Sequence, residues 1–239
     1  MHTYDASAKV QNRLADRLLH MLDVVPDTAF ASVLEIGCCT GTLTEKVCAA
    51  KPVQQIYCND LVPEFEEILH TKFSTKHTVK RIPHFGDIET VALPPDVNLV
   101  ISGATFQWLS DLPAFIKRLG RELHSGSWLA FSLFNSGTLK EFSAVTNVEL
   151  EYVKDLALKK ILQTDFELVR DESYEDTLYF PTVREILGHI RETGVGGVSE
   201  YKWNKNSLQR FETVYKKQFS TTCGIPVSYS SSCYLLKKR

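Results

Sequence analysis

The chain has 239 residues, a hydrophobic share of 44%, a charged share of 23% and a formal net charge of −2. This length accommodates one large domain, and the balance of hydrophobic and charged residues is typical of a globular enzyme. The small negative charge argues against a protein that holds nucleic acid through a general cationic field. The first ten residues lack the apolar run of a signal peptide, and no stretch approaches the roughly 18 to 20 apolar residues that span a bilayer. We therefore expect a cytoplasmic protein without nucleic-acid or membrane partners.

The six cysteines show no CxxC pair and no spacing typical of zinc ligands. Four of them lie within the first 60 residues. We expect reduced thiols, as in most cytosolic proteins, and no metal site.

The first half of the chain alternates strands with helices. Apolar residues recur at four-residue intervals from Val10 to Leu22, which predicts an amphipathic helix over residues 7–24. Short β-branched runs predict strands at 32–36, 54–58, 79–84, 97–102 and 127–133, with helices at 42–50, 63–73 and 111–123. Such alternation implies right-handed crossovers and a mostly parallel sheet with helices on both faces. The predicted fold class is doubly wound α/β, or Rossmann-like.

The second half of the chain does not continue this alternation of strands and helices. Residues 138–180 are charged and helical in pattern, without a defensible strand, and we expect a helical lid or insertion there. Terminal signals predict a helix over 181–192, and Ser207 could cap another that runs to Phe219. Residues 226–236 indicate a last strand that returns antiparallel to the sheet. We expect one domain over 1–239, with 138–180 as its insertion.

The most informative segment is 33–43, VLEIGCCTGTL, in which an apolar strand enters a glycine-bearing turn and then a helix. Gly37 and Gly41 permit backbone conformations and close approaches that a Cβ would obstruct. The amides that open the helix could receive a carboxylate. A dinucleotide fingerprint starting at Gly37 would need glycines at positions 39 and 42, where the chain has Cys39 and Thr42. NAD and FAD are therefore disfavoured.

The order Glu35, Gly37, Gly41 resembles motif I of class I S-adenosylmethionine-dependent methyltransferases. In that family the loop wraps the methionine part of the cofactor, and the acid lies near its amino group. The resemblance implies cofactor contacts from Glu35, Gly37, Cys38, Cys39 and Gly41. Cys39 departs from the family's usual glycine, and a positive φ at this position would cost it on the order of 1 kcal/mol.

Acidic residues follow the next two strands. Asp60 lies 23 residues after Gly37, where an acid can accept hydrogen bonds from both ribose hydroxyls, although a free surface acid is the alternative. After the third strand the family places an acid beside the adenine amino group and an apolar residue against the ring, which here implies Asp87 and Ile88. The resemblance adds Leu61, Ser102 and Gln107 to the cofactor-binding candidates.

Residues 106–108, Phe-Gln-Trp, follow the strand at 97–102 and should border the transferred methyl group. Phe106 and Trp108 are weak substrate-binding candidates, because aromatic residues at helical spacing usually belong to the core.

Around this core the chain resembles the malonyl-acyl-carrier-protein O-methyltransferases of biotin synthesis over nearly its whole length. The matching segments are residues 3–11, 106–112, 129–132, 137–139, 193–194 and 226–229. The resemblance implies methyl transfer from S-adenosylmethionine to the free carboxylate of a malonyl thioester, carried on acyl carrier protein or coenzyme A. The cofactor product would be S-adenosylhomocysteine, and the methyl ester would start pimelate synthesis.

Such chemistry needs no general base, since a carboxylate is already ionised at neutral pH. Alignment and water exclusion would then carry catalysis, and Tyr4 could donate a hydrogen bond or close the site. Weak candidates for orienting the malonyl carboxylate are Lys140, Arg184, His189 and Arg191. The carrier protein is acidic, so the basic clusters that could dock it are Lys117, Arg118 and Arg121, or Lys159 and Lys160.

Two other functions stay open from the sequence. A methyltransferase for a free small carboxylic acid, of the aconitate type, would need no docking surface. A non-methylating assembly factor with the same fold would keep the cofactor-binding acids without transferring a methyl group.

Overall fold

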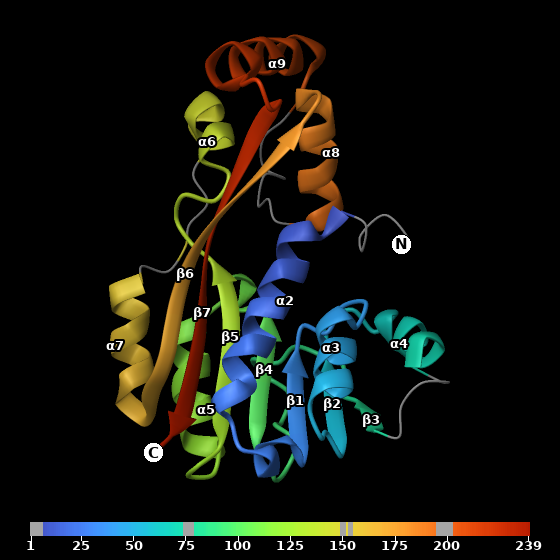
Figure 1. Cartoon of the computed structure of the whole chain (residues 1–239), viewed down its shortest axis with the longest axis vertical. Helices are drawn as coiled ribbons and strands as arrows, with labels where there is room; N and C mark the ends of the chain where they lie inside the picture. The colour runs from blue at the N-terminus through green and yellow to red at the C-terminus, as the bar shows by residue number, and fades with distance from the viewer. Residues whose placement is uncertain (1–6, 74–78, 149–151, 153–154, 195–202) are drawn as a thin grey trace. The chain divides into compact units, whose positions relative to one another are not determined.

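The structure of the protein is a computed structural model, which describes residues 7–73, 79–148, 152, 155–194 and 203–239. Seven strands form one sheet in the order β3-β2-β1-β4-β5-β7-β6 (Figure 1). The chain divides into two compact units. We call them the sheet unit, with Gln11–Leu133, Lys154–Glu172 and Ser232–Arg239, and the helical unit, with Met1–Val10, Phe134–Val153 and Ser173–Ser231.

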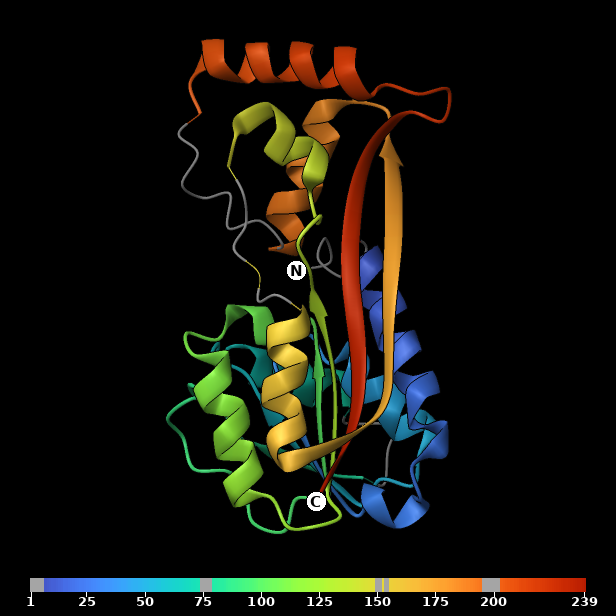
Figure 2. The same cartoon turned by 90° about the vertical axis from the view of Figure 1, so that its left-hand side faces the viewer.

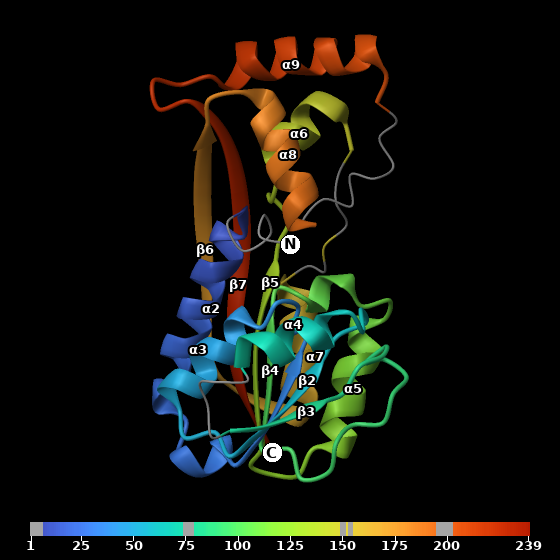
Figure 3. The same cartoon turned by 90° about the vertical axis from the view of Figure 1, so that its right-hand side faces the viewer.

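The sheet unit confirms the predicted alternation of strands and helices. Its strands are β1 (Ser32–Ile36), β2 (Gln55–Asn59), β3 (Lys80–Pro83), β4 (Leu99–Gly103) and β5 (Trp128–Phe134), and each neighbouring pair among them is parallel. Its helices are α2 (Lys9–Met21), α3 (Thr42–Ala50), α4 (Phe65–Phe73), α5 (Leu112–Glu122) and α7 (Asp155–Asp165), with 3₁₀ turns at Leu22–Val24, Asp27–Phe30 and Phe106–Trp108. Helices α2 and α3 cover one face of the sheet, and α5 and α7 cover the other (Figures 2 and 3).

The core of the sheet unit follows from this pattern. Every residue of β1 and β5 is buried, as expected for parallel strands covered on both faces. Helix α5 buries an apolar stripe at helical spacing, and its N-cap Asp111 accepts a hydrogen bond from the Ala114 amide at 2.9 Å. Phe131 stacks between Phe106 and Tyr234, with ring centroids 4.7 and 5.0 Å away. This aromatic stack joins the turn after β4 to β5 and β7.

The helical unit contains α6 (Lys140–Thr146), α8 (Val183–Thr193) and α9 (Lys205–Phe219). The strands β6 (Phe166–Phe180) and β7 (Ile225–Lys238) contribute residues to both units. Helix α9 begins at a capping box in which Asn204 and Ser207 bond each other's backbone amides at 2.8 and 2.9 Å. The predicted cap, Ser207, is thus the third residue of the helix, and Asn204 is the N-cap.

Strand β6 corrects the prediction that residues 138–180 hold no strand. It spans fifteen residues at the edge of the sheet, and six of them are charged. Its side chains alternate between more and less exposed positions, but charged residues occur on both faces, which hides the apolar alternation that marks a strand. Charged edge strands resist pairing with other chains, which accounts for this composition. The helical part of the prediction is confirmed by α6 and α7, and the role of 138–180 as a cover stays a prediction.

The last strand returns antiparallel, as predicted. The amides of Asn135 and Lys238 donate to the carbonyls of Ser230 and Ser127 at 2.8 and 2.7 Å, so residue numbers rise along β5 as they fall along β7. In the described part of the chain, every helix is too short or too polar to span a bilayer.

Candidate functional site

The loop between β1 and α3, residues 37–41, has an unusual backbone. Gly37, Cys39 and Gly41 all have positive φ, at 74°, 48° and 80°. A Cβ on Gly37 would lie 2.0 Å from the Thr105 hydroxyl oxygen, and a Cβ on Gly41 would lie 2.5 Å from the Leu69 side chain. Positive φ favours glycine at both positions, and a side chain there would also have to displace Thr105 at Gly37 or Leu69 at Gly41. Cys39 shows the positive φ that makes a non-glycine residue strained.

Asp60 holds this loop through its carboxylate. Its Oδ2 accepts a hydrogen bond from the Cys39 amide at 2.9 Å, and its Oδ1 accepts one from the Val62 amide at 3.1 Å. The neighbouring Asn59 carbonyl accepts from the amides of Gly37 and Cys38, both at 2.9 Å. The end of β2 thus fixes the loop after β1 at the carboxyl edge of the parallel sheet, where ligands bind in such folds.

Glu35 is a buried acid at the end of β1. Its side chain is 1% exposed, and Oε2 accepts a hydrogen bond from the Thr44 hydroxyl at 2.5 Å. Burial raises the pKa of Glu35 to about 8, because the charged carboxylate loses its water. The free protein therefore favours a protonated Glu35 at neutral pH. A cationic group nearby would favour the ionised form.

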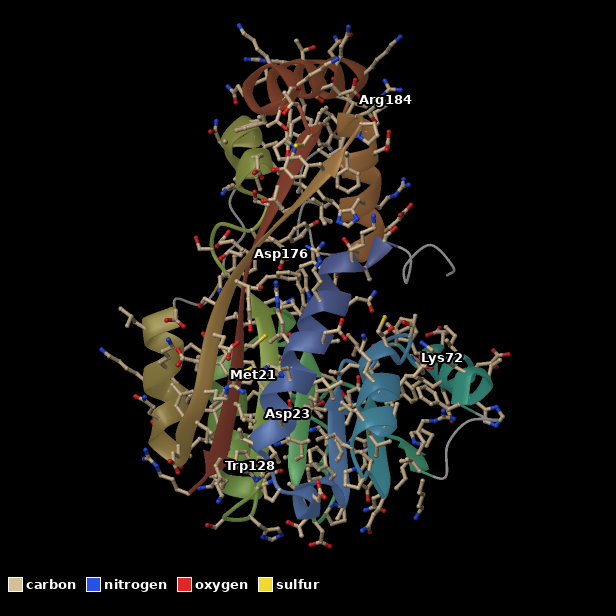
Figure 4. All side chains as sticks on the ribbon, in the orientation of Figure 1. Met21, Asp23, Lys72, Trp128, Asp176 and Arg184 are labelled. Carbon is tan, nitrogen blue, oxygen red and sulfur yellow. The ribbon has the colours of Figure 1, made fainter. Side chains whose placement is uncertain are left out.

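Three residues that the sequence did not single out also shape this loop. Lys72 of α4 donates to the Thr40 carbonyl at 3.3 Å and pairs with Glu45 at 3.3 Å (Figure 4). Thr105 fills the space that Gly37 leaves without a side chain. Asn59 donates through its side-chain amide to the carbonyls of His84 and Gly86 at 2.8 and 3.0 Å, which fixes the turn before Asp87. Of these three, only Asn59 could have been found from the sequence, because it is a polar residue beside Asp60 at the end of a strand.

The other cofactor-binding candidates differ in exposure. Ser102 is fully buried, and its hydroxyl donates to the Ile36 carbonyl at 2.9 Å, so it joins the ends of β4 and β1. Gln107 donates to the Ala104 carbonyl at 2.6 Å, while its Oε1 is buried without a hydrogen-bond partner among the described residues. An unpaired buried acceptor is costly, so a ligand that donates to Gln107 would remove this cost.

Exposed apolar side chains follow the strand ends of the sheet unit. Leu61 after β2 is 71% exposed, and Trp108 after β4 is 50% exposed. Ile88 is buried beside Asp87, whose exposed carboxylate accepts from the Glu89 amide at 2.9 Å. Phe106 is a core residue with no exposed surface, so only Trp108 of the predicted pair remains a candidate for substrate contact.

The predicted carboxylate-orienting residues lie in the helical unit and are not gathered there. Arg184 lies in the first turn of α8, at the end next to α9, and pairs with Glu212 of α9 at 2.6 Å (Figure 4). Lys140 and Arg191 are exposed. His189 is buried and lies 2.7 Å from the Tyr229 hydroxyl, and burial lowers its pKa. Tyr4, the predicted catalytic residue, lies outside the described residues.

Nothing in the described ranges suggests a metal centre. His, Cys, Asp and Glu side chains there form no group of three or more that could hold a metal ion, and no disulfide joins any of the six cysteines.

Comparisons with known proteins agree with this geometry. Residues 34–131, which include the loop, Asp60 and Asp87, match a family model described as a methyltransferase domain. The phosphoethanolamine N-methyltransferase 2 of Haemonchus contortus, solved in complex with S-adenosyl-L-methionine, superposes with a TM-score of 0.55 over 93% of this chain and 52% of its own, at 14% identity. The YcgJ protein of Bacillus subtilis superposes with a TM-score of 0.64 over 95% of this chain and 98% of its own, at 12% identity. These likenesses show a shared fold.

Sequence similarity goes further than the fold. The malonyl-acyl-carrier-protein O-methyltransferase of Chlorobium phaeovibrioides is 32% identical over 240 residues, a match that covers 99% of this chain and 92% of that protein. The similarity therefore includes the helical unit as well as the sheet unit. The chain belongs to the malonyl-acyl-carrier-protein O-methyltransferase family.

Proposed function

We propose that this protein transfers the methyl group of S-adenosylmethionine to the free carboxylate of a malonyl group held as a thioester on acyl carrier protein. The products are the malonyl methyl ester and S-adenosylhomocysteine, and the reaction is cytoplasmic. The observation that carries the proposal is the left-handed loop at 37–41, held by Asp60, in a chain that is similar to malonyl-acyl-carrier-protein O-methyltransferases over its full length.

The residues at this edge of the sheet fit the cofactor. Gly37 and Gly41 give the loop the positive φ angles of its turn at the carboxyl edge of the sheet. Asp60 uses one lone pair of Oδ2 to hold the loop through the Cys39 amide and one of Oδ1 to accept from the Val62 amide, and the remaining lone pairs can accept from ribose hydroxyls. Leu61 offers exposed apolar surface to the adenine ring, and Asp87 offers a carboxylate to its amino group. In this assignment, Glu35 supplies negative charge toward the amino group of the methionine part.

When bound, S-adenosylmethionine supplies an electrophilic methyl group on a positively charged sulfur. The protein's task is to align the malonyl carboxylate with that methyl and to exclude water, since the carboxylate is already ionised at neutral pH. Nucleophile and sulfonium neutralise each other as the reaction proceeds, so a dry site favours the transition state over the charged reactants. The half-exposed Trp108 would border this site, and Tyr4 would donate a hydrogen bond on the acceptor side.

A parallel methyl-transfer assay tests the proposal with three acceptors: malonyl carrier protein, malonyl-coenzyme A and free malonate. We expect methylation of the malonyl thioesters, with the carrier protein preferred. Methylation of free dicarboxylic acids alone would replace the proposal with the small-acid function. Cofactor binding without transfer to any carboxylate would instead favour the assembly factor.

The role of Tyr4 needs its own variant. Tyr4→Phe should lower turnover while calorimetry shows cofactor affinity close to that of the wild type, because the hydroxyl serves the acceptor. An equal loss of cofactor affinity would place Tyr4 on the cofactor instead.

A further inference from the structure

The basic clusters that the sequence offers for carrier-protein docking are partly occupied in the structure. Arg118 donates to the carbonyls of Ile88 and Val91 at 3.0 and 2.6 Å and pairs with Glu122, so its guanidinium fastens α5 to the turn after Asp87. Lys159 pairs with Asp155 and Asp171. One cation of each predicted cluster is therefore structural, and each cluster loses charge that it could offer to a partner.

Helix α9 of the helical unit has the opposite character. It carries four basic residues and one acid, in a chain whose formal net charge is −2. The acid, Glu212, is paired with Arg184 of α8. The basic residues are Lys205, Arg210, Lys216 and Lys217, and all four are exposed. Among the described residues, no ion pair is formed by any of these four. Figure 4 shows nitrogen-tipped side chains projecting outward from this helix.

The helix that presents these cations is firmly placed within the helical unit. Phe211 and Tyr215, one turn apart, are buried against the unit's interior. Phe211 packs against Phe142 and Trp203 with ring centroids 5.2 and 5.0 Å apart, and the Tyr215 hydroxyl donates to the Pro226 carbonyl at 2.8 Å. The apolar face thus points inward, which leaves the basic face outward and ordered.

A groove of about 750 Å³ runs beside this basic face within the helical unit. Val145 of α6 and Phe211 and Val214 of α9 supply apolar lining, and Asn204, Lys205 and Arg210 supply polar and cationic lining. A floor of apolar side chains with cations at its rim suits a helix that is acidic on its exposed face. Lys205 also lies in the first turn of α9, which contains no acid, although helix N-termini prefer negative charge. A partner's carboxylates would supply that charge.

We propose that the exposed face of α9, with the groove that it shares with α6, is the docking surface for acyl carrier protein. The proposal rests on the proposed function for the identity of the partner, whose acidic surface complements the four exposed cations of α9. It replaces the two clusters predicted from the sequence as the principal docking site.

A direct binding measurement tests this surface without requiring methyl transfer. Fluorescence anisotropy of labelled malonyl carrier protein is recorded for the wild type and for the double variant Lys205→Glu/Arg210→Glu. We expect the Kd to rise about tenfold at low salt, and the difference to shrink as salt is added, because exposed charges are screened. The neutral variant Lys205→Gln/Arg210→Gln should give an intermediate Kd, and it preserves the test if the charge reversal disturbs folding.

The matched comparison is Lys117→Glu/Arg121→Glu on α5, which reverses the same number of exposed cations in the rival cluster. Its Kd should stay within about twofold of the wild type. A larger loss from the α5 pair than from the α9 pair would overturn the proposal, as would a duplex oligonucleotide that binds the wild type more tightly than carrier protein does. If carrier protein binds through α9 and no malonyl thioester is methylated, the proposed function fails while the docking surface stands.

Discussion

The two units of this chain handle buried polar groups in different ways. In the sheet unit, carboxylates and amides at the strand ends hold a loop with three left-handed residues, and acceptors such as Gln107 Oε1 lack a partner among the described residues. In the helical unit, Glu141 accepts from the Ser228 hydroxyl at 2.5 Å and His189 meets Tyr229, while Ser231 Oγ is the one buried side-chain atom without a partner among that unit's described residues. Clustered positive φ angles and an unpaired acceptor therefore mark the candidate ligand site, whereas the helical unit has separate positive-φ residues, Leu139 and Asn147, and buried side-chain pairs.

The sharpest test of this contrast compares one glycine from each unit. Gly37→Ala adds a Cβ that meets Thr105 at 2.0 Å and strains a left-handed residue, so we expect a loss of at least about 3 kcal/mol in the free energy of unfolding. Gly188→Ala in α8 adds a Cβ with no neighbour within 4 Å, and should gain about 0.5 to 1 kcal/mol. Urea unfolding of both variants measures the difference. Equal midpoints would show that the loop relaxes freely.

The second prediction concerns pH and Glu35. The folded protein keeps the Glu35 proton up to a pKa of about 8, whereas the unfolded chain releases it near the ordinary value of 4.5. The folded state thus binds more protons between these values, so the contribution of Glu35 to stability falls as pH rises through that window. Glu35→Gln should remove this decline and gain on the order of a few kcal/mol over the wild type at pH 9. Parallel stability curves for the two proteins would contradict the raised pKa.

The same contrast explains how much the sequence could predict. The parallel strands and the loop at 37–41 were predictable because apolar runs, glycines and strand-end acids are local patterns. The edge strand β6 was not, because six charged residues among fifteen hide its alternation. The support from Thr105 and Lys72 depends on residues that are close in space and distant in sequence. The basic face of α9 could not be selected as a docking surface from the sequence, because only the structure shows that Arg118 and Lys159 of the other clusters are already paired.

The third prediction tests the ribose assignment of Asp60. Asp60→Ala removes the acceptor for the Cys39 amide as well as the proposed ribose contact, and should weaken cofactor binding by about 1 to 3 kcal/mol, or about fivefold to 150-fold in Kd. Asp60→Asn keeps one carbonyl oxygen and should lose less. Calorimetry with S-adenosylmethionine and S-adenosylhomocysteine gives both values. Unchanged affinity in the alanine variant would defeat the assignment.

The fourth prediction concerns the His189–Tyr229 pair of the helical unit. Burial lowers the pKa of His189, so the folded state resists protonation, and stability should fall as pH drops from about 6.5 through the lowered pKa. His189→Leu should abolish this dependence, which is opposite in sign to that of Glu35. In a cycle with Tyr229→Phe, the double variant should cost about 1 kcal/mol less than the sum of the single variants, because each single change leaves a buried partner unpaired. Additive costs in thermal unfolding would show that the 2.7 Å contact contributes nothing to stability.

The smallest expected effect lies at Cys39, a non-glycine residue whose φ of 48° strains this loop. Cys39→Gly should remove about 1 kcal/mol of strain and lose part of that gain to the entropy of glycine, so a net stabilisation of about 0.5 kcal/mol is expected. The Cys39 amide still donates to Asp60, because that bond uses the backbone, and cofactor binding should be at least as tight. Cys39→Ala keeps the strained backbone without the thiol and should match the wild type in urea unfolding and in calorimetry. If alanine and glycine both weaken cofactor binding, the thiol itself contacts the ligand, and Cys39 is a selected feature of the site.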